Sequence, residues 1–367
     1  MDASSEPDSV STRLMALLRQ AIAEAGGWLP FDRFMALALY QPGLGYYANT
    51  APKFGAMPQS GSDFVTAPEL SPLFGRALAA QLRQALQVTG TTTVMEFGAG
   101  SGALAEQVLE ALGDTLHRYE IVDLSGVLRA RQQQRLARFG ERVCWLDRWP
   151  ETIEAVVLGN EVLDAMPVQL LHWDGAQWLE RGVVAAGDGL GWRDAPTALK
   201  PPVDAGFAPG TVTEIHAQAE AFVTTLAQRL RRGAAFFIDY GFPEAEYYHP
   251  QRRGGTLMCH RAHRADSEPL QDVGLKDITA HVNFTGIALA GQAAGLEVIG
   301  YTTQAHFLFN CGLLAMLEAA DVRGRAMAQK LVTEHEMGEL FKVIGFAAPG
   351  QGFEPLGFVQ GDRMHRL

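Results

Sequence analysis

The sequence predicts an α/β protein built on a mostly parallel, doubly wound sheet with helices on both faces, a Rossmann-like arrangement. Three observations indicate this fold class. From Thr91 onwards, apolar strand-like segments alternate with helical ones, which is the order expected of a parallel sheet with crossover helices. A glycine-rich turn at residues 98–102 separates the first strand from its helix. The segments 154–160 and 233–241 are largely apolar, as strands buried on both faces are.

Residues 1–90 precede this alternation and are expected to form a helical extension with a lid. Leu14, Leu17, Leu18 and Ile22 recur at helical spacing, so a helix is predicted over residues 11–25, with others at 31–39 and 71–88. The intervening residues 40–68 read as a loop and contain glycines, prolines and several aromatics. A loop of this length and composition is typical of a functional segment rather than a disordered linker.

Residues 91–367 are expected to form the main domain. Its predicted strands are 91–97, 119–124, 142–146, 154–160 and 233–241, with helices at 103–112, 127–139 and 214–232. Residues 168–193 alternate apolar and polar side chains around two Asp-Gly turns, which predicts a small antiparallel insertion near 168–210. The tail is predicted to add helices at 284–294 and across 305–335, and strands at 296–303 and 341–346.

Composition narrows the function class. The chain has 367 residues, 47% of them hydrophobic, and a formal net charge of −11. This balance argues against binding to nucleic acid and favours neutral or basic substrates. The three cysteines form no CxxC pair, and no apolar run reaches the ~18 residues of a membrane span. With no signal or transit peptide visible at the N-terminus, the sequence predicts a cytoplasmic protein without a membrane partner. It leaves the oligomeric state open.

The strongest local signal is the segment Glu96-Phe97-Gly98-Ala99-Gly100-Ser101-Gly102. Its glycines allow a tight strand-to-helix turn and let a ligand approach the backbone. With Ala103, the turn also matches the dinucleotide pattern G-x-G-x-x-A, and Asp123 follows at a distance suited to binding a ribose diol. A pyrophosphate prefers positive potential, however, whereas the Glu96 carboxylate suits the ammonium and sulfonium of S-adenosylmethionine. The acidic residue therefore favours the methyl donor over NAD. The position of the turn between a strand and a helix argues against a turn that binds nothing.

A second cluster of polar residues follows the apolar strand 154–160. Asn160, Glu161 and Asp164 stand where ligands bind in doubly wound sheets, at the carboxyl end of a strand. The two acids would therefore lie beside the transferring methyl group. The structural alternative is that Asn160 and Asp164 are turn or helix-cap residues, whereas the long side chain of Glu161 makes a poor cap.

Several longer segments resemble one family: FDRFMALALYQPGLGYY, GSDFVTAPELSPLFG, MEFGAGSGALA, NEVLDAMPVQ, IDYGFP and DITAHVNFT. In this order they are similar to the MidA-like S-adenosylmethionine-dependent methyltransferases, whose mitochondrial members are complex I assembly factors that methylate an arginine. The resemblance runs from about Phe31 to Phe346. It implies a class I methyltransferase fold, a catalytic domain at 91–367, S-adenosylmethionine as cofactor and a protein partner with a basic segment.

The resemblance also implies roles for particular residues. The cofactor-binding set is Glu96, Gly98, Gly100, Gly102 and Asp123, and the catalytic set is Asn160, Glu161 and Asp164. It also implies that Asp63, Phe64, Thr66 and Pro68 close over the substrate cleft. The loop aromatics Tyr46 and Tyr47, and His281, are predicted as further cleft or lid residues from the sequence itself. The sequence departs from the family pattern in three places: Asp123 replaces the usual glutamate, Asn283 replaces an aspartate, and His260 stands where an aromatic is expected.

Two other interpretations of function remain open on the sequence. One is an NAD-type oxidoreductase that uses the same glycine turn, and the other is a catalytically silent assembly or chaperone factor on this fold. Cys259, His260 and His263 suggest metal ligation, but they lack the spacing of a zinc site, so no metal is predicted. His281 is either a catalytic base or, the favoured option, a structural histidine.

Overall fold

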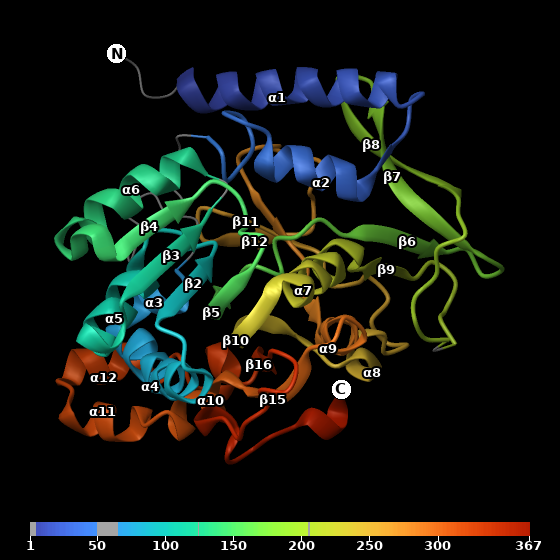
Figure 1. Cartoon of the computed structure of the whole chain (residues 1–367). Coiled ribbons are helices and arrows are strands. Elements are labelled where there is room, and N and C mark those ends of the chain that lie inside the picture. The colour runs from blue at the N-terminus through green and yellow to red at the C-terminus, as the bar shows by residue number, and fades with distance from the viewer. Residues whose placement is uncertain (1–4, 50–64, 124, 205) are drawn as a thin grey trace.

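The structure is a computed structural model that describes residues 5–49, 65–123, 125–204 and 206–367. Its centre is a large sheet with the strand order β15-β16-β10-β5-β2-β3-β4, and β14 pairs with β10 (Figure 1). The strands are β2 (Thr93–Phe97), β3 (Arg118–Val122), β4 (Val143–Leu146), β5 (Ile153–Asn160), β10 (Leu230–Phe242), β14 (Val282–Asn283), β15 (Glu297–Thr303) and β16 (Phe341–Ala347). All neighbours are parallel except β16, which runs antiparallel to β10 and β15. The predicted α/β class is confirmed.

The strand order reverses direction between β2 and β5. From β2 the chain proceeds outward to β3 and β4, and it then returns to place β5 and β10 on the other side of β2. Such a reversal leaves a crevice at the carboxyl ends of the two central strands, because their connections leave over opposite faces. The glycine turn follows β2 and the acidic segment follows β5, so both predicted site segments open into this crevice.

Helices cover both faces of the sheet. On one face, α4 (Pro72–Thr89), α5 (Ala103–Leu112) and α10 (Gln304–Asn310) bury apolar side chains against the strands, with α11 (Leu313–Ala319) and α12 (Val322–Gln329) outside them. On the other face, α7 (Ala217–Arg229) and α9 (Phe284–Ala293) do the same. The helix α6 (Gly126–Leu136) connects β3 to β4. Two apolar layers therefore hold the sheet rigid beneath the crevice.

A smaller sheet joins the N-terminal helices to the insertion. It has the order β1-β7-β6-β9, with β8 on β7, and its strands are β1 (Leu29–Pro30), β6 (Gln169–Trp173), β7 (Trp178–Ala186), β8 (Gly189–Pro196) and β9 (Val212–Ile215). The helices α1 (Ser5–Glu24) and α2 (Phe31–Tyr40) pack on it, and a third apolar cluster fills the contact. Since β1 pairs with β7, the N-terminal extension and the insertion form one layer over the crevice.

The structure differs from the sequence prediction in four segments. Helix α1 begins at Ser5 rather than Ser11, and Ala67–Leu70 form a short helix, α3, inside the expected loop. Glu214 and Ile215, at the start of the expected helix 214–232, belong instead to β9, because they pair with β6. An unpredicted three-stranded sheet contains β11 (Met258–Arg261), β12 (Arg264–Asp266) and β13 (Asp277–Thr279). Within the described ranges, every helix is too short or too polar to cross a bilayer.

Candidate active site

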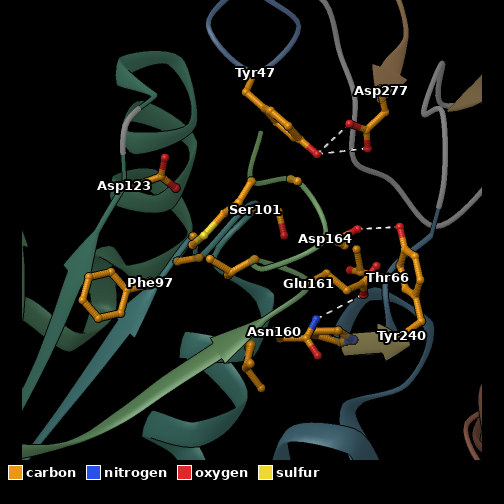
Figure 2. Close-up of a pocket in the computed structure, with 18 of the residues that line it drawn as sticks. Tyr47, Thr66, Phe97, Ser101, Asp123, Asn160, Glu161, Asp164, Tyr240 and Asp277 are labelled. Atoms are coloured by element: carbon orange, nitrogen blue, oxygen red, sulfur yellow. Dashed lines mark hydrogen bonds between the residues drawn. The ribbon is translucent and has the colours of Figure 1, made fainter. Parts of the chain in front are cut away.

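A cavity of about 1350 Å³ occupies the crevice at the carboxyl ends of β2 and β5. Its wall includes Glu96, Gly98, Gly100, Asp123, Asn160, Glu161 and Asp164, together with Tyr47, Thr66, Pro68 and His281. Figure 2 shows Asp164 and Glu161 lying below the pair Tyr47 and Asp277, with Asp123 on the opposite side of the view. The structure thus brings the two predicted clusters, about sixty residues apart in the sequence, to one site.

The glycine turn has a backbone conformation that residues other than glycine rarely adopt. Gly98, Gly100 and Gly102 have φ angles of 65°, 53° and 81°, in the left-handed region that glycine adopts without steric cost. A Cβ on Gly98 would lie 3.0 Å from Cγ2 of Val162, which shows how closely the glycine turn and the acidic segment approach. Gly102 lies outside the cavity wall and precedes α5 as its N-cap.

Two carboxyl groups flank this turn. Glu96 is 2% exposed and accepts a hydrogen bond of 2.7 Å from the Tyr119 hydroxyl. Burial raises the pKa of Glu96 to about 8. Asp123 accepts hydrogen bonds from the backbone N–H of Ser125 at 2.9 Å and from Nε2 of Gln132 at 2.8 Å, and burial raises its pKa as well. Both groups would be stabilised in their charged form by a cationic or hydrogen-bonding ligand.

The sequence analysis missed Gln132, which holds both the Asp123 carboxylate and the backbone of the glycine turn. Its fully buried amide donates from Nε2 to the Asp123 carboxylate and, at 2.9 Å, to the Gly100 carbonyl. Its Oε1 accepts the indole N–H of Trp145 at 3.0 Å. The residue stands in a run of three glutamines on α6. Nothing in the local sequence distinguishes it from its neighbours.

The segment after β5 forms an irregular turn of residues 161–166, which we call the acidic turn. Glu161 has φ = 53°, which costs a non-glycine residue of order 1–3 kcal/mol unless its surroundings impose it. Its N–H donates to the Ile238 carbonyl at 2.9 Å, and its Oε1 accepts from Nδ2 of Asn160 at 3.1 Å. Since no α-helix follows this turn, Asn160 and Asp164 are not helix caps.

Two oxygen atoms are buried without a partner among the described residues: Oδ1 of Asn160, at the end of β5, and Oδ1 of Asp164, in the acidic turn. The other Asp164 oxygen accepts a hydrogen bond from the Tyr240 hydroxyl (Figure 2). Burial raises the pKa of Asp164 to about 6, and burial together with the charge of Asp164 raises that of Glu161 to about 8. Unsatisfied buried acceptors are rare and need an explanation, and a ligand with N–H donors would supply it.

Asp239, on β10, is a second residue that sequence reasoning missed. It is 1% exposed, and its Oδ2 accepts the backbone N–H groups of Val162, Leu163 and Asp164 at 3.1, 2.9 and 3.3 Å. Its Oδ1 accepts the N–H of Tyr240 at 3.0 Å. Burial, followed by the charges of Asp164 and Glu161, raises the pKa of Asp239. Asp239 therefore holds the backbone of the acidic turn from behind.

The expected cleft residues fall into three groups. Asp63 and Phe64 lie outside the described residues. Tyr47, Thr66, Pro68 and His281 line the cavity, whereas Tyr46 is 1% exposed and packs in the N-terminal apolar cluster. Helix α3, which contains Pro68, is anchored by a 2.8 Å hydrogen bond from Nε2 of Gln107 to the Pro68 carbonyl.

His281 differs from a satisfied structural histidine. Its Nδ1 is buried and has no partner in the described part of the chain. The ring stacks on Phe242 with centroids 5.3 Å apart and meets Tyr240 edge-on. Burial lowers the pKa of His281 to about 4, so the ring is neutral at physiological pH and makes a weak base.

Residues 73–302 match a protein family described as "Putative S-adenosyl-L-methionine-dependent methyltransferase". The chain belongs to this methyltransferase family. The S-adenosylmethionine-dependent methyltransferase family predicted from the sequence motifs is thereby confirmed, and the alternative of an NAD-type oxidoreductase is wrong.

Similar proteins, both solved structures and curated sequences, are also named as methyltransferases. A crystal structure of a candidate methyl transferase from Burkholderia thailandensis, bound to S-adenosyl-homocysteine, has a TM-score of 0.95 and 49% identity, covering 99% of this chain and 98% of that one. A Drosophila melanogaster relative named protein arginine methyltransferase NDUFAF7 homolog, mitochondrial, is 27% identical over 84% of this chain and 76% of its own length. The human protein arginine methyltransferase NDUFAF7 is 26% identical, with 83% and 73% covered.

The structure explains one departure from the family pattern and shows where a second one lies. Asn283 caps α9, because its Oδ1 accepts the N–H of Gly286 at 3.3 Å, and an amide serves as well as a carboxylate in that position. His260 lies on β11 and lines the cavity. Cys259 beside it is fully buried, and no three His, Cys, Asp or Glu side chains gather as a metal site among the residues described.

Proposed function

We propose that this methyltransferase transfers a methyl group from S-adenosylmethionine to an arginine side chain of a partner protein with a basic segment. One observation carries the proposal: Oδ1 of Asn160 and Oδ1 of Asp164, both buried and without a partner among the described residues, belong to residues that line the same cavity as the glycine turn. An arginine guanidinium offers five N–H donors in one plane and a delocalised positive charge, which match such acceptors. The relatives named protein arginine methyltransferases support the same substrate class.

The donor subsite would consist of Glu96, Gly98, Gly100 and Asp123 on the cavity wall, with Gly102 supporting the turn from outside that wall. The left-handed glycines leave the backbone open to close approach. Asp123, held by Gln132, would accept hydrogen bonds from ribose hydroxyls. Glu96 is a buried carboxyl with a raised pKa, and a cationic ligand would compensate its charge. When bound, the donor supplies an electrophilic methyl group on a sulfonium.

Asn160, Glu161 and Asp164 would bind and orient the acceptor. Charge-assisted hydrogen bonds from a guanidinium to these oxygens would fix one nitrogen toward the methyl group. That nitrogen loses a proton when the new C–N bond forms, and the Glu161 carboxylate is suited to accept it, since its pKa of about 8 lies near neutral pH. The cavity wall would exclude water from the reacting atoms.

The N-terminal extension would close the acceptor side. In the proposed division of the chain, residues 1–90 supply Tyr40, Tyr47 and Thr66 to the cavity wall, and residues 91–367 supply the glycine and acidic turns. A cytoplasmic location is part of the same proposal. Its support is that all three cysteines are free thiols, as is usual in a reducing compartment.

The proposal is tested by incubating the enzyme with isotopically labelled S-adenosylmethionine and an extract of the source cells. The modified residue is then located by fragmentation mass spectrometry. Label on an arginine of one or a few proteins is expected. Label on lysine, on a carboxylate or on RNA would contradict the arginine assignment, and no label in any fraction would favour the silent assembly factor.

A further inference from the structure

Asp277, on β13, faces the cavity from the side opposite the donor subsite. The side chain is 3% exposed and belongs to the cavity wall. The Tyr47 hydroxyl donates to both of its oxygens, at 2.8 and 2.9 Å, and Figure 2 shows this pair above Asp164 and Glu161. Asp277 opens the segment DITAHVNFT, but the local sequence does not show that its carboxylate faces the cavity of the acidic turn, which lies more than a hundred residues away in the chain.

The position of Asp277 is fixed from two directions. Tyr47 stacks on Tyr40, with ring centroids 5.6 Å apart and planes inclined by 19°, and the Tyr40 hydroxyl donates to the Ala165 carbonyl at 2.8 Å. Just beyond β13, the N–H of Ala280 donates to the Asp164 carbonyl at 3.0 Å. Asp277 is thus tied to the acidic turn both through the aromatic pair and through its own strand.

Among the described residues, no cation pairs with the acidic turn across this space. Oδ1 of Asp164 is unpartnered among the described residues, and Asp164 is 4% exposed. Neither Asp164 nor Glu161 takes part in an ion pair within the described ranges. Burial raises the pKa of Glu161, and the charges of Asp164 and Asp277 add to that shift. Three carboxyl groups therefore converge where a buried cation would relieve their repulsion.

We infer that Asp277 is an acceptor-binding residue, which encloses the substrate's planar cation between itself and the pair Glu161 and Asp164. The inference rests on the proposed function, because that cation is taken to be an arginine guanidinium. A carboxylate has about four lone-pair sites, so Asp277 can accept from Tyr47 and still bind a guanidinium N–H. A flat cation can contact acids on two sides at once, whereas an ammonium donates from a single point.

Binding of small probes to the S-adenosyl-homocysteine-loaded enzyme tests this inference. The probe is N-acetyl-arginine methylamide, its neutral isostere is the citrulline analogue, and calorimetry or ligand-observed NMR measures the dissociation constants. Asp277→Asn should weaken arginine-probe binding at least tenfold, as expected for losing hydrogen bonds between charged groups. Binding of the citrulline analogue should change much less. The control Asp272→Asn removes an exposed acid of the preceding segment, which pairs with Arg261, and should leave both affinities within about twofold.

A wild-type preference for arginine over citrulline that survives in Asp277→Asn would overturn the inference. If that variant does not bind S-adenosyl-homocysteine, Tyr47→Phe replaces it. Removing the two hydrogen bonds should weaken arginine-probe binding several-fold without changing S-adenosyl-homocysteine affinity, and an unchanged dissociation constant would overturn the inference too. Failure of the proposed function is distinguishable, because the label transferred to protein would then be mapped to a residue other than arginine.

Discussion

Replacing Asp239 with alanine should separate donor binding from methyl transfer. The Asp239 carboxylate accepts three successive N–H groups of the acidic turn, and its Oδ1 accepts a fourth from Tyr240. Asp239 itself does not line the cavity. Without it, the backbone of Val162, Leu163 and Asp164 would lose its acceptor, and the left-handed conformation of Glu161 would lose a restraint on the residues that follow it.

The magnitude follows from these contacts. A hydrogen bond to a charged group contributes about 1.5–3 kcal/mol, but the three N–H groups share one oxygen and one bond is long, at 3.3 Å. The loss is therefore about 2–4 kcal/mol in total. Relief of the strain at Glu161, of order 1 kcal/mol, and of repulsion with Asp164 and Glu161 offsets part of it. The free energy of unfolding should fall by about 1–3 kcal/mol.

Methyl transfer should fall further than stability. A shift of about 1 Å in a positioning group costs on the order of 100-fold in rate, so kcat/KM should drop at least that much. The affinity for S-adenosyl-homocysteine should stay within about threefold, because the glycine turn follows a different strand. Urea unfolding, calorimetry and labelled-donor kinetics measure the three quantities, with the exposed Asp188→Ala as control and Asp239→Asn as a partial rescue of the N–H acceptor. Wild-type kcat/KM in a folded Asp239→Ala variant would refute the reasoning.

Three further predictions concern the donor subsite. Gly100→Val should abolish S-adenosyl-homocysteine binding measured by calorimetry, because Gly100 has φ = 53° and lines the cavity. The control is Gly90→Val, because Gly90 is also left-handed but lies away from the cavity; this variant should bind normally. Binding by both variants would contradict the role of the turn. Asp123→Ala should weaken binding by about 1–3 kcal/mol, the contribution of hydrogen bonds to a charged group, and an unchanged affinity would exclude that contact. Because the pKa of Glu96 is about 8 without a ligand, a cationic donor must displace its proton below that pH. The affinity for S-adenosylmethionine should therefore rise from pH 6 to pH 8 and then level off, with a flatter profile in Glu96→Gln; a dissociation constant independent of pH in the wild type would argue against this coupling.

The sequence was sufficient to predict the central sheet because its signals are local. The apolar strands 154–160 and 233–241 and the glycine turn after residue 97 each determine their own backbone, and β5, β10 and β2 follow. The position of Asn160, Glu161 and Asp164 could also be predicted. They follow a strand that is recognisable from its local sequence, and residues that end neighbouring parallel strands meet at one edge of the sheet.

The supporting residues could not be predicted, because their roles depend on contacts between distant segments. Asp239 lies 75 to 77 residues from the N–H groups that it accepts, and Gln132 looks like its two glutamine neighbours until α6 is placed against the glycine turn. The strands β11 and β12 are short and carry several charged and polar side chains, so they lack the alternation that identifies a strand. Burial and pairing, rather than sequence pattern, determine these elements.

The most direct test of the account compares wild-type enzyme, Glu161→Gln and the exposed control Glu151→Gln in one labelled-donor experiment with the acceptor site mapped. Glu161→Gln keeps the size of the side chain and removes its charge. We predict that wild type and Glu151→Gln place the label on the same arginine. Glu161→Gln should bind S-adenosyl-homocysteine normally but transfer the methyl group more slowly by at least two orders of magnitude, as when positioning and electrostatic stabilisation are lost together. Full transfer by Glu161→Gln, or label on a residue other than arginine in the wild type, would contradict the account.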